Sequence, residues 1–146
     1  MLTRFSLTGF LLALATFGST FSAVAVPPPN NDCANATAIS EGVTLSSYNF
    51  GATDSGAPRA DFSDLNDVWF SYTAATTETV NVSLCGSDFD TTLEIFGACG
   101  GNVLALNDDS GTCGAQSVIE CLPVQSGQTY LIRVAGWSAQ EGDIAI

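Results

Sequence analysis

The chain of 146 residues contains no histidine and no lysine. The lack of histidine excludes Ser-His-Asp and Cys-His catalytic sites, and it excludes zinc sites with histidine ligands. The lack of lysine excludes catalysis by a lysine nucleophile. What remains for an enzyme is chemistry with a pair of carboxylates, of the kind that glycoside hydrolases use.

Positive charge is also scarce. Arg4, Arg59 and Arg133 are the three basic residues, set against fifteen aspartates and glutamates, and the formal net charge is −12. Phosphate binding needs a basic surface, so nucleic acid and anionic membranes are poor partners. A cation such as calcium, a cationic partner or plain solubility fits this charge better.

The N-terminus has the pattern of a secretory signal peptide. The apolar run "FSLTGFLLALATFG" follows Arg4, and Ala23 and Ala25 form a small-residue cleavage site, which predicts a signal peptide over 1–25. The run is too short and too rich in Ser, Thr and Gly for a good membrane span. We therefore expect an exported protein, secreted or at the cell surface, that does not contact the membrane after cleavage.

Two further segments complete the predicted domain organisation. "VPPPNND", residues 26–32, is a Pro-rich, polyproline-like leader. Residues 33–146 are enough for one domain. The last strand pattern continues to Ile146, which leaves open whether the chain is a fragment of a longer protein.

Cysteine is present in an odd number, five, in a chain that we expect to be exported. At most two disulfides can form within the chain, and one thiol is left over. Cys99 and Cys113 flank the run "GGNVLALNDDSGT" and lie near turns, so we prefer this pair. Four cysteines already allow three pairings, and the other connectivities remain open.

Short segments of alternating polar and apolar residues dominate the rest. The clearest are "DVWFSYTA", "ETVNVSLC", "TTLEIFG" and "TYLIRVAGW", with "SVIECLPV", "GVTLSSYNFGAT" and "GDIAI" as weaker cases. This pattern predicts an all-β, antiparallel β-sandwich with about eight or nine short strands.

Several segments occur in a familiar order. "NDCANATAI", "DVWFSYTA", "TVNVSLCGSDFDTTLEIFG", "LALNDDSG" and "GQTYLIRVAGW" resemble the bacterial pre-peptidase C-terminal domain in its cysteine-bearing, secreted versions. The resemblance extends from Asn31 to Ile146 and implies a jelly-roll-like, non-catalytic domain that accompanies secreted enzymes or surface proteins. Relatives of that kind bind polymers or calcium, or assist export. This chain has Leu106 where such sequences often have a cysteine, and it has Cys121 in a strand where no cysteine is expected.

Acidic and amide side chains cluster around two neighbouring strand segments. Asp88 and Asp90 precede the segment at 91–97, whereas Asn107, Asp108 and Asp109 follow the segment at 102–107. If these segments form a hairpin, both groups lie at the same end of the sandwich. Calcium takes six to eight oxygen ligands, and these side chains could supply most of them. Alternatively, they only form Asx-turns.

Three other features have structural and functional interpretations. Asp61, Asp64 and Asp67 form a second acidic group, better explained as a solvated loop. A sugar-binding platform would need Trp69, Tyr72 or Trp137 exposed together, although aromatics in a sandwich usually belong to the core. Arg133 alternates with apolar residues and should pair with a carboxylate.

These observations favour a secreted, non-catalytic accessory or binding β-sandwich domain that requires no cofactor, with calcium as the candidate ion. A carbohydrate- or matrix-binding module is the main alternative. A carboxylate-based hydrolase would need two acids converging in a cleft, one with a raised pKa. Expected partners are a polysaccharide or protein matrix, or a catalytic domain covalently linked beyond the end of this chain.

Overall fold

The computed structural model describes residues 25–56 and 65–146. These residues form nine strands and two short 3-10 helices, which confirms the all-β prediction. The predicted signal peptide, apart from Ala25, lies outside the described residues, as do Asp61 and Asp64. The elements are η1 (Cys33–Asn35), β1 (Thr37–Ile39), β2 (Ser46–Tyr48), β3 (Leu65–Thr73), β4 (Glu78–Ser83), β5 (Thr91–Phe96), β6 (Val103–Asn107), β7 (Val118–Val124), β8 (Thr129–Gly136), η2 (Trp137–Ala139) and β9 (Asp143–Ala145).

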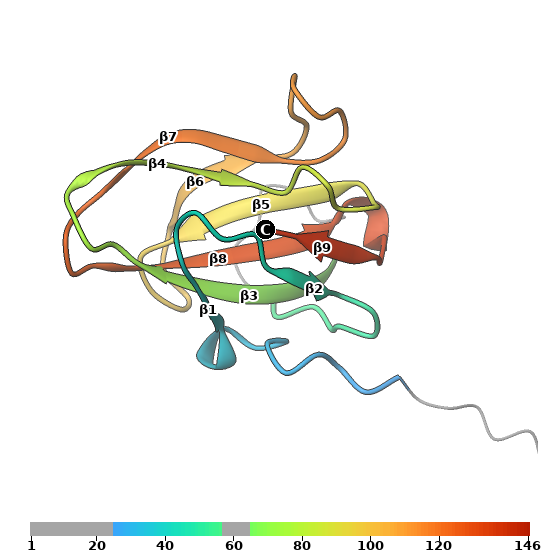
Figure 1. Ribbon diagram of the computed structural model, residues 1–146. Coiled ribbons are helices and arrows are strands. Elements are labelled where there is room, and N and C mark those ends of the chain that lie inside the picture. The colour runs from blue at the N-terminus through green and yellow to red at the C-terminus, as the bar shows by residue number, and fades with distance from the viewer. Residues whose placement is uncertain (1–24, 57–64) are drawn as a thin grey trace, which may run out of the picture.

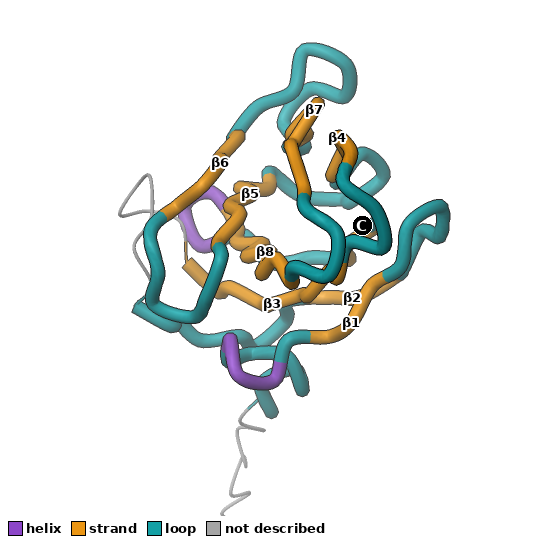
Figure 2. Tube along the Cα trace, turned by 90° about the vertical axis from the view of Figure 1, so that its left-hand side faces the viewer, coloured by secondary structure: helices purple, strands orange, loops and turns teal. Residues whose placement is uncertain are grey.

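The strands form a sandwich of one larger sheet and two small ones. The larger sheet has the order β1-β3-β8-β5-β6, and the small sheets are the pairs β4-β7 and β2-β9. All pairs are antiparallel except β1 with β3. Figure 2 looks along the strands and shows β4 and β7 opposite β3, β8 and β5. Among the described residues, no helix is long and apolar enough to cross a membrane.

The core lies between the sheets and follows the period-two pattern of the sequence. Alternate residues of the central strands point inward because successive side chains of a strand face opposite sides. The large sheet contributes Val68, Phe70, Leu93, Ile95, Ile132 and Val134, and the β4-β7 pair contributes Val82, Ile119, Leu122 and Val124.

The outer face of the large sheet is buried as well. Every residue of β5 is buried, including Thr92, Glu94 and Phe96, which point away from the core. Part of the cover is the N-terminal segment, because Asn30 is 3% exposed and its Nδ2 donates to the Trp69 carbonyl at 3.0 Å. Figure 2 shows η1 beneath β3, on the side away from β4 and β7.

A buried ionic cluster occupies this outer face. Arg133 Nε lies 3.1 Å from Asp67 Oδ2, and its Nη1 donates to Glu94 Oε2 at 2.8 Å. Trp69 Nε1 donates to Asp67 Oδ2 at 2.9 Å. The predicted pairing of Arg133 is confirmed. The placement of Asp67 in a solvated loop is wrong, because its side chain is completely buried against the guanidinium.

The two disulfides are Cys33–Cys99 and Cys85–Cys113, with Cα–Cα distances of 5.8 and 5.6 Å, and Cys121 is free and exposed. The predicted pair Cys99–Cys113 is therefore wrong. Cys99 lies in the turn before β6 and Cys113 lies beyond its end. A strand of this length spans about 17 Å, far more than the Cα separation that a disulfide tolerates.

Candidate functional site

One end of the sandwich gathers four connecting segments, which together we call the loop end (Figure 1). They are the residues 49–51 after β2, the β4–β5 loop, the β6–β7 loop and the segment from η2 to β9. Hydrogen bonds join these segments to one another. Asp143 N donates to Asp88 Oδ1 at 2.7 Å, Asn49 Nδ2 donates to the Gln140 carbonyl at 3.1 Å, and Asp90 N donates to Gln140 Oε1 at 3.3 Å.

Three acidic residues converge at the loop end, and we call them the acidic triad. Asp90 lies just before β5, whereas Asp108 and Asp109 lie just after β6. Each contributes one carboxylate oxygen, and these oxygens lie within 4.8 Å of one another, so the triad could hold a metal ion. The predicted hairpin of β5 and β6 is confirmed by the pairing of Leu93 with Asn107, and it brings these residues together.

The electrostatics of the triad penalise ionisation of Asp90. Burial raises the pKa of Asp90, and the neighbouring Asp109 carboxylate raises it further. Within the described residues, Asp90 Oδ1 is buried and has no hydrogen-bond partner. A cation at this position would offset the repulsion between the Asp90 and Asp109 carboxylates, and it would give Asp90 Oδ1 a partner.

The other two residues of the predicted calcium set have structural contacts. Asp88 Oδ1 accepts the bond from Asp143 N described above, and Asn107 Oδ1 accepts from Val118 N at 2.8 Å. Both bonds fix backbone segments at the loop end. Asp88 does not belong to the group of three that converges.

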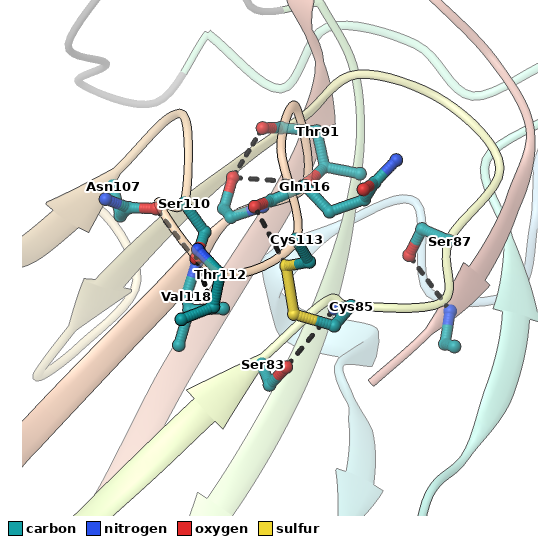
Figure 3. Close-up of a disulfide and its surroundings, with 12 residues drawn as sticks. Ser83, Cys85, Ser87, Thr91, Asn107, Ser110, Thr112, Cys113, Gln116 and Val118 are labelled. Carbon is teal, nitrogen blue, oxygen red and sulfur yellow. Dashed lines mark hydrogen bonds between the residues drawn. A yellow bond between two sulfur atoms is a disulfide. The ribbon is translucent and has the colours of Figure 1, made fainter.

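The β6–β7 loop is fastened beside the β4–β5 loop (Figure 3). The Cys85–Cys113 disulfide joins the two loops. Ser117 Oγ donates to the Asp108 carbonyl at 2.6 Å, and Ser117 N donates to Thr91 Oγ1 at 3.0 Å. The disulfide and these bonds therefore set the position of Asp108 relative to β5 and hence to Asp90.

The aromatic residues do not form the platform considered from the sequence. Trp69 is 1% exposed and packs on Phe96 with ring centroids 5.4 Å apart. Instead, Tyr48 and Phe50 are 42% and 47% exposed. Their centroids lie 6.3 Å apart with 27° between the ring planes. The i, i+2 spacing of Tyr48 and Phe50 in a strand segment was the signal that could have identified this aromatic pair.

Carboxylates lie beside the aromatic pair. Asp143 pairs with Tyr48 across β2 and β9, and both side chains are exposed. Glu141 Oε1 accepts a hydrogen bond from Gly51 N, next to Phe50, at 3.0 Å. Exposed ring faces and hydrogen-bond acceptors therefore occur together at the loop end.

Residues 29–145 match the family described as galactose binding domain-like, a family associated with type IX secretion. The chain belongs to this family. Its members are typically non-catalytic modules, which is consistent with a secreted binding domain, as are two disulfides. No curated protein and no solved structure matches the chain significantly.

The resemblance to the pre-peptidase C-terminal domain is therefore wrong. The segments that suggested it are short alternating strands and Asp/Asn/Gly turns between them. Exported β-sandwiches of different families share such segments. One face of each strand must be buried, and each tight turn needs residues that tolerate unusual backbone angles. They indicate the architecture correctly and do not distinguish these two families.

Proposed function

We propose that this galactose binding domain-like module binds a neutral carbohydrate on the aromatic pair at the loop end. The exposed, nearly parallel rings of Tyr48 and Phe50 are the observation that carries the proposal. A pyranose presents an apolar C–H face to an aromatic ring, and burying that face against the rings excludes water from both.

The surrounding charges select the type of sugar. Asp143 and Glu141 can accept hydrogen bonds from sugar hydroxyls that project beyond the rings. Arg133 is the sole basic side chain in the described part of the chain, and it is fully buried on the outer face of the large sheet. From the described residues, sulfated sugars and uronic acids would meet only negative charge here, which favours neutral sugars.

Affinity electrophoresis in gels containing a soluble polysaccharide tests this proposal. Neutral galactan, glucan and mannan are compared with polygalacturonate. At least one neutral polymer should retard the protein, and polygalacturonate should not. Tyr48→Ala and Phe50→Ala should each weaken retardation about tenfold, which corresponds to a loss of about 1.4 kcal/mol.

Leu104→Ala is the matched control, because Leu104 is also an exposed apolar residue, 57% accessible, but lies on β6. This variant should bind like the wild type. The proposal fails if no neutral polymer retards the protein, or if the double variant of Tyr48 and Phe50 is retarded as strongly as the wild type.

We further propose that the acidic triad binds calcium and thereby orders the loop end. The raised pKa of Asp90 and its unpartnered Oδ1 favour this second candidate. Hard carboxylate oxygens suit calcium, and extracellular sites of this kind are weak, with Kd of about 10⁻⁴ to 10⁻³ M. Binding to the native state alone adds stability.

Thermal unfolding in millimolar calcium, compared with excess chelator at matched ionic strength, tests the calcium proposal. Calcium should raise the melting temperature, and Asp108→Ala should abolish the rise. Asp32→Asn, which removes one exposed charge outside the triad, should retain it. Equal midpoints in calcium and chelator would leave the triad with a role in turn formation alone.

A further inference from the structure

A concave site lies on the side of the sandwich, away from the loop end. It opens between residues 40–43, which connect β1 to β2, and the middle of β4. Its volume is about 120 Å³. The wall is mainly apolar and is formed by Ile39, Val43, Val80, Val82, Ile132 and Ile146. We call this site the side cleft.

The size of the side cleft limits what it can hold. An apolar cavity of about 150 Å³ takes up one benzene molecule, whereas sites for drug-sized ligands measure roughly 300–1,000 Å³. At about 120 Å³, the side cleft matches a single side chain. The apolar wall requires that most of this side chain be hydrocarbon.

A carboxylate lies at the cleft. Glu41 and Tyr72 line it. Burial raises the pKa of Tyr72, and the charges of Glu41 and Glu78 raise it further. Arg133, the one cation among residues 25–56 and 65–146, is buried on the other face of the large sheet.

An apolar slot with a carboxylate in its lining suits a ligand with a hydrocarbon stem and a cationic end. A lysine side chain has four methylene groups and a compact ammonium with three donors. Those donors can bond to acceptors on separate segments that line the cleft, here Glu41 before β2 and Ser83 on β4. The planar fork of arginine instead favours one carboxylate held for bidentate pairing, and its broader head fits this mouth less well.

We propose that the side cleft binds a lysine side chain of a partner protein, with the methylene stem against the apolar wall and the ammonium at Glu41. This chain contains no lysine, so the ligand comes from a different polypeptide. The net charge of −12 favours a cationic partner and accelerates its approach. The proposal is independent of the carbohydrate and calcium sites.

Titration of ¹⁵N-labelled protein with Nα-acetyl-lysine-methylamide tests the inference. Saturable chemical-shift changes should appear at the amides of residues 40–43 and 80–83. The norleucine analogue, which keeps the stem and lacks the charge, should bind at least fivefold more weakly. Glu41→Gln should reduce lysine affinity about threefold or more, and raised salt should weaken binding.

Two controls separate the cleft from general electrostatics. Asp32→Asn removes the same charge at an exposed position outside the cleft and should leave the titration unchanged. Glu41 is exposed, so its substitution should leave the fold intact, which the spectrum itself reports. Equal binding of norleucine, tighter binding of the arginine analogue, or the absence of saturable shifts at these amides would overturn the assignment.

Discussion

Arg133 carries its charge in the interior because two carboxylates and an indole surround it. Its contacts to Asp67 and Glu94 compensate much of the desolvation of the guanidinium, and Trp69 supplies a further hydrogen bond to Asp67. A buried pair of this kind adds little net stability over apolar residues, but removing one partner leaves an uncompensated charge. The cluster therefore links β3, β8 and β5 on the outer face of the large sheet.

The first prediction concerns this buried cluster. Arg133→Met should lower the free energy of unfolding by about 3–5 kcal/mol, because Asp67 and Glu94 then remain buried without their cation. Glu94→Gln should lower it less, since the amide still accepts from Arg133 and Asp67 still balances the guanidinium. Urea unfolding, with the slope checked for constancy, measures both values. Equal losses for the two variants would contradict this account of the cluster.

The second prediction concerns Gly136, at the end of β8. A Cβ atom there would lie 1.9 Å from the Gln140 carbonyl oxygen, which belongs to the backbone. Gly136→Ala should therefore destabilise the fold by about 1–3 kcal/mol through overpacking. Gly111→Ala is the matched control, because nothing lies within 4 Å of its Cβ. If both substitutions had the same small effect, the close approach of the 136–140 turn would be disproved.

At the scale of elements, the two disulfides act on different parts of the sandwich. Cys33–Cys99 joins η1 to the β5–β6 turn, whereas Cys85–Cys113 joins two loops of the loop end. Their sequence separations are 66 and 28 residues. Loop-closure entropy then gives about 4.3 and 3.6 kcal/mol, a difference too small to distinguish the bridges by stability alone.

The third prediction therefore uses calcium to distinguish the two bridges. Replacing Cys85 and Cys113 by serine should lower stability and also remove the calcium-dependent rise in melting temperature, because the bridge holds Asp108 near Asp90. Replacing Cys33 and Cys99 should lower stability but retain the rise. Peptide mapping without reduction first verifies the pairing in the wild type. A rise that survives loss of Cys85–Cys113 would show that the loop positions the triad without the bridge.

For the whole molecule, local sequence patterns were enough to predict most strands. The candidate sites depend on contacts between residues that are far apart in the sequence. Alternation around Phe70 and Ile132 was enough to identify β3 and β8 and the core side of each. The β5–β6 hairpin followed from two adjacent strand segments, so the meeting of Asp90 with Asp108 was predictable. The short strand β1 was missed as a strand because only three residues pair.

The failures concern residues whose partners lie far away in sequence. Trp69 is buried, as expected for an aromatic residue of a sandwich, but the cover that Asn30 provides was not visible in the local pattern at β3. Cysteine spacing does not say which turns face each other across the sandwich, so Cys99 was paired wrongly. Tyr48 and Phe50 were part of a predicted strand, but their exposure depends on how β2 pairs with β9 at the edge.

The last prediction joins charge, pH and stability at the acidic triad. The folded-state pKa of Asp90 is raised above its value in the unfolded chain, so the folded state holds the proton more tightly. Stability from this group is present at low pH and is lost as the pH rises through the folded-state pKa. In chelator at neutral pH, Asp90→Asn should therefore be more stable than the wild type, and the difference should vanish at acidic pH. Asp32→Asn is the matched charge control, because Asp32 is exposed and lies outside the triad. In calcium the order of stability should reverse, because the wild type can bind the ion with the Asp90 carboxylate, which the variant lacks.

Thermal unfolding of the three proteins across pH, with calcium and with chelator, measures the effect of pH and the effect of calcium separately. An Asp90→Asn variant that is less stable than the wild type in chelator at every pH would show that the carboxylate stabilises the loop end without a cation.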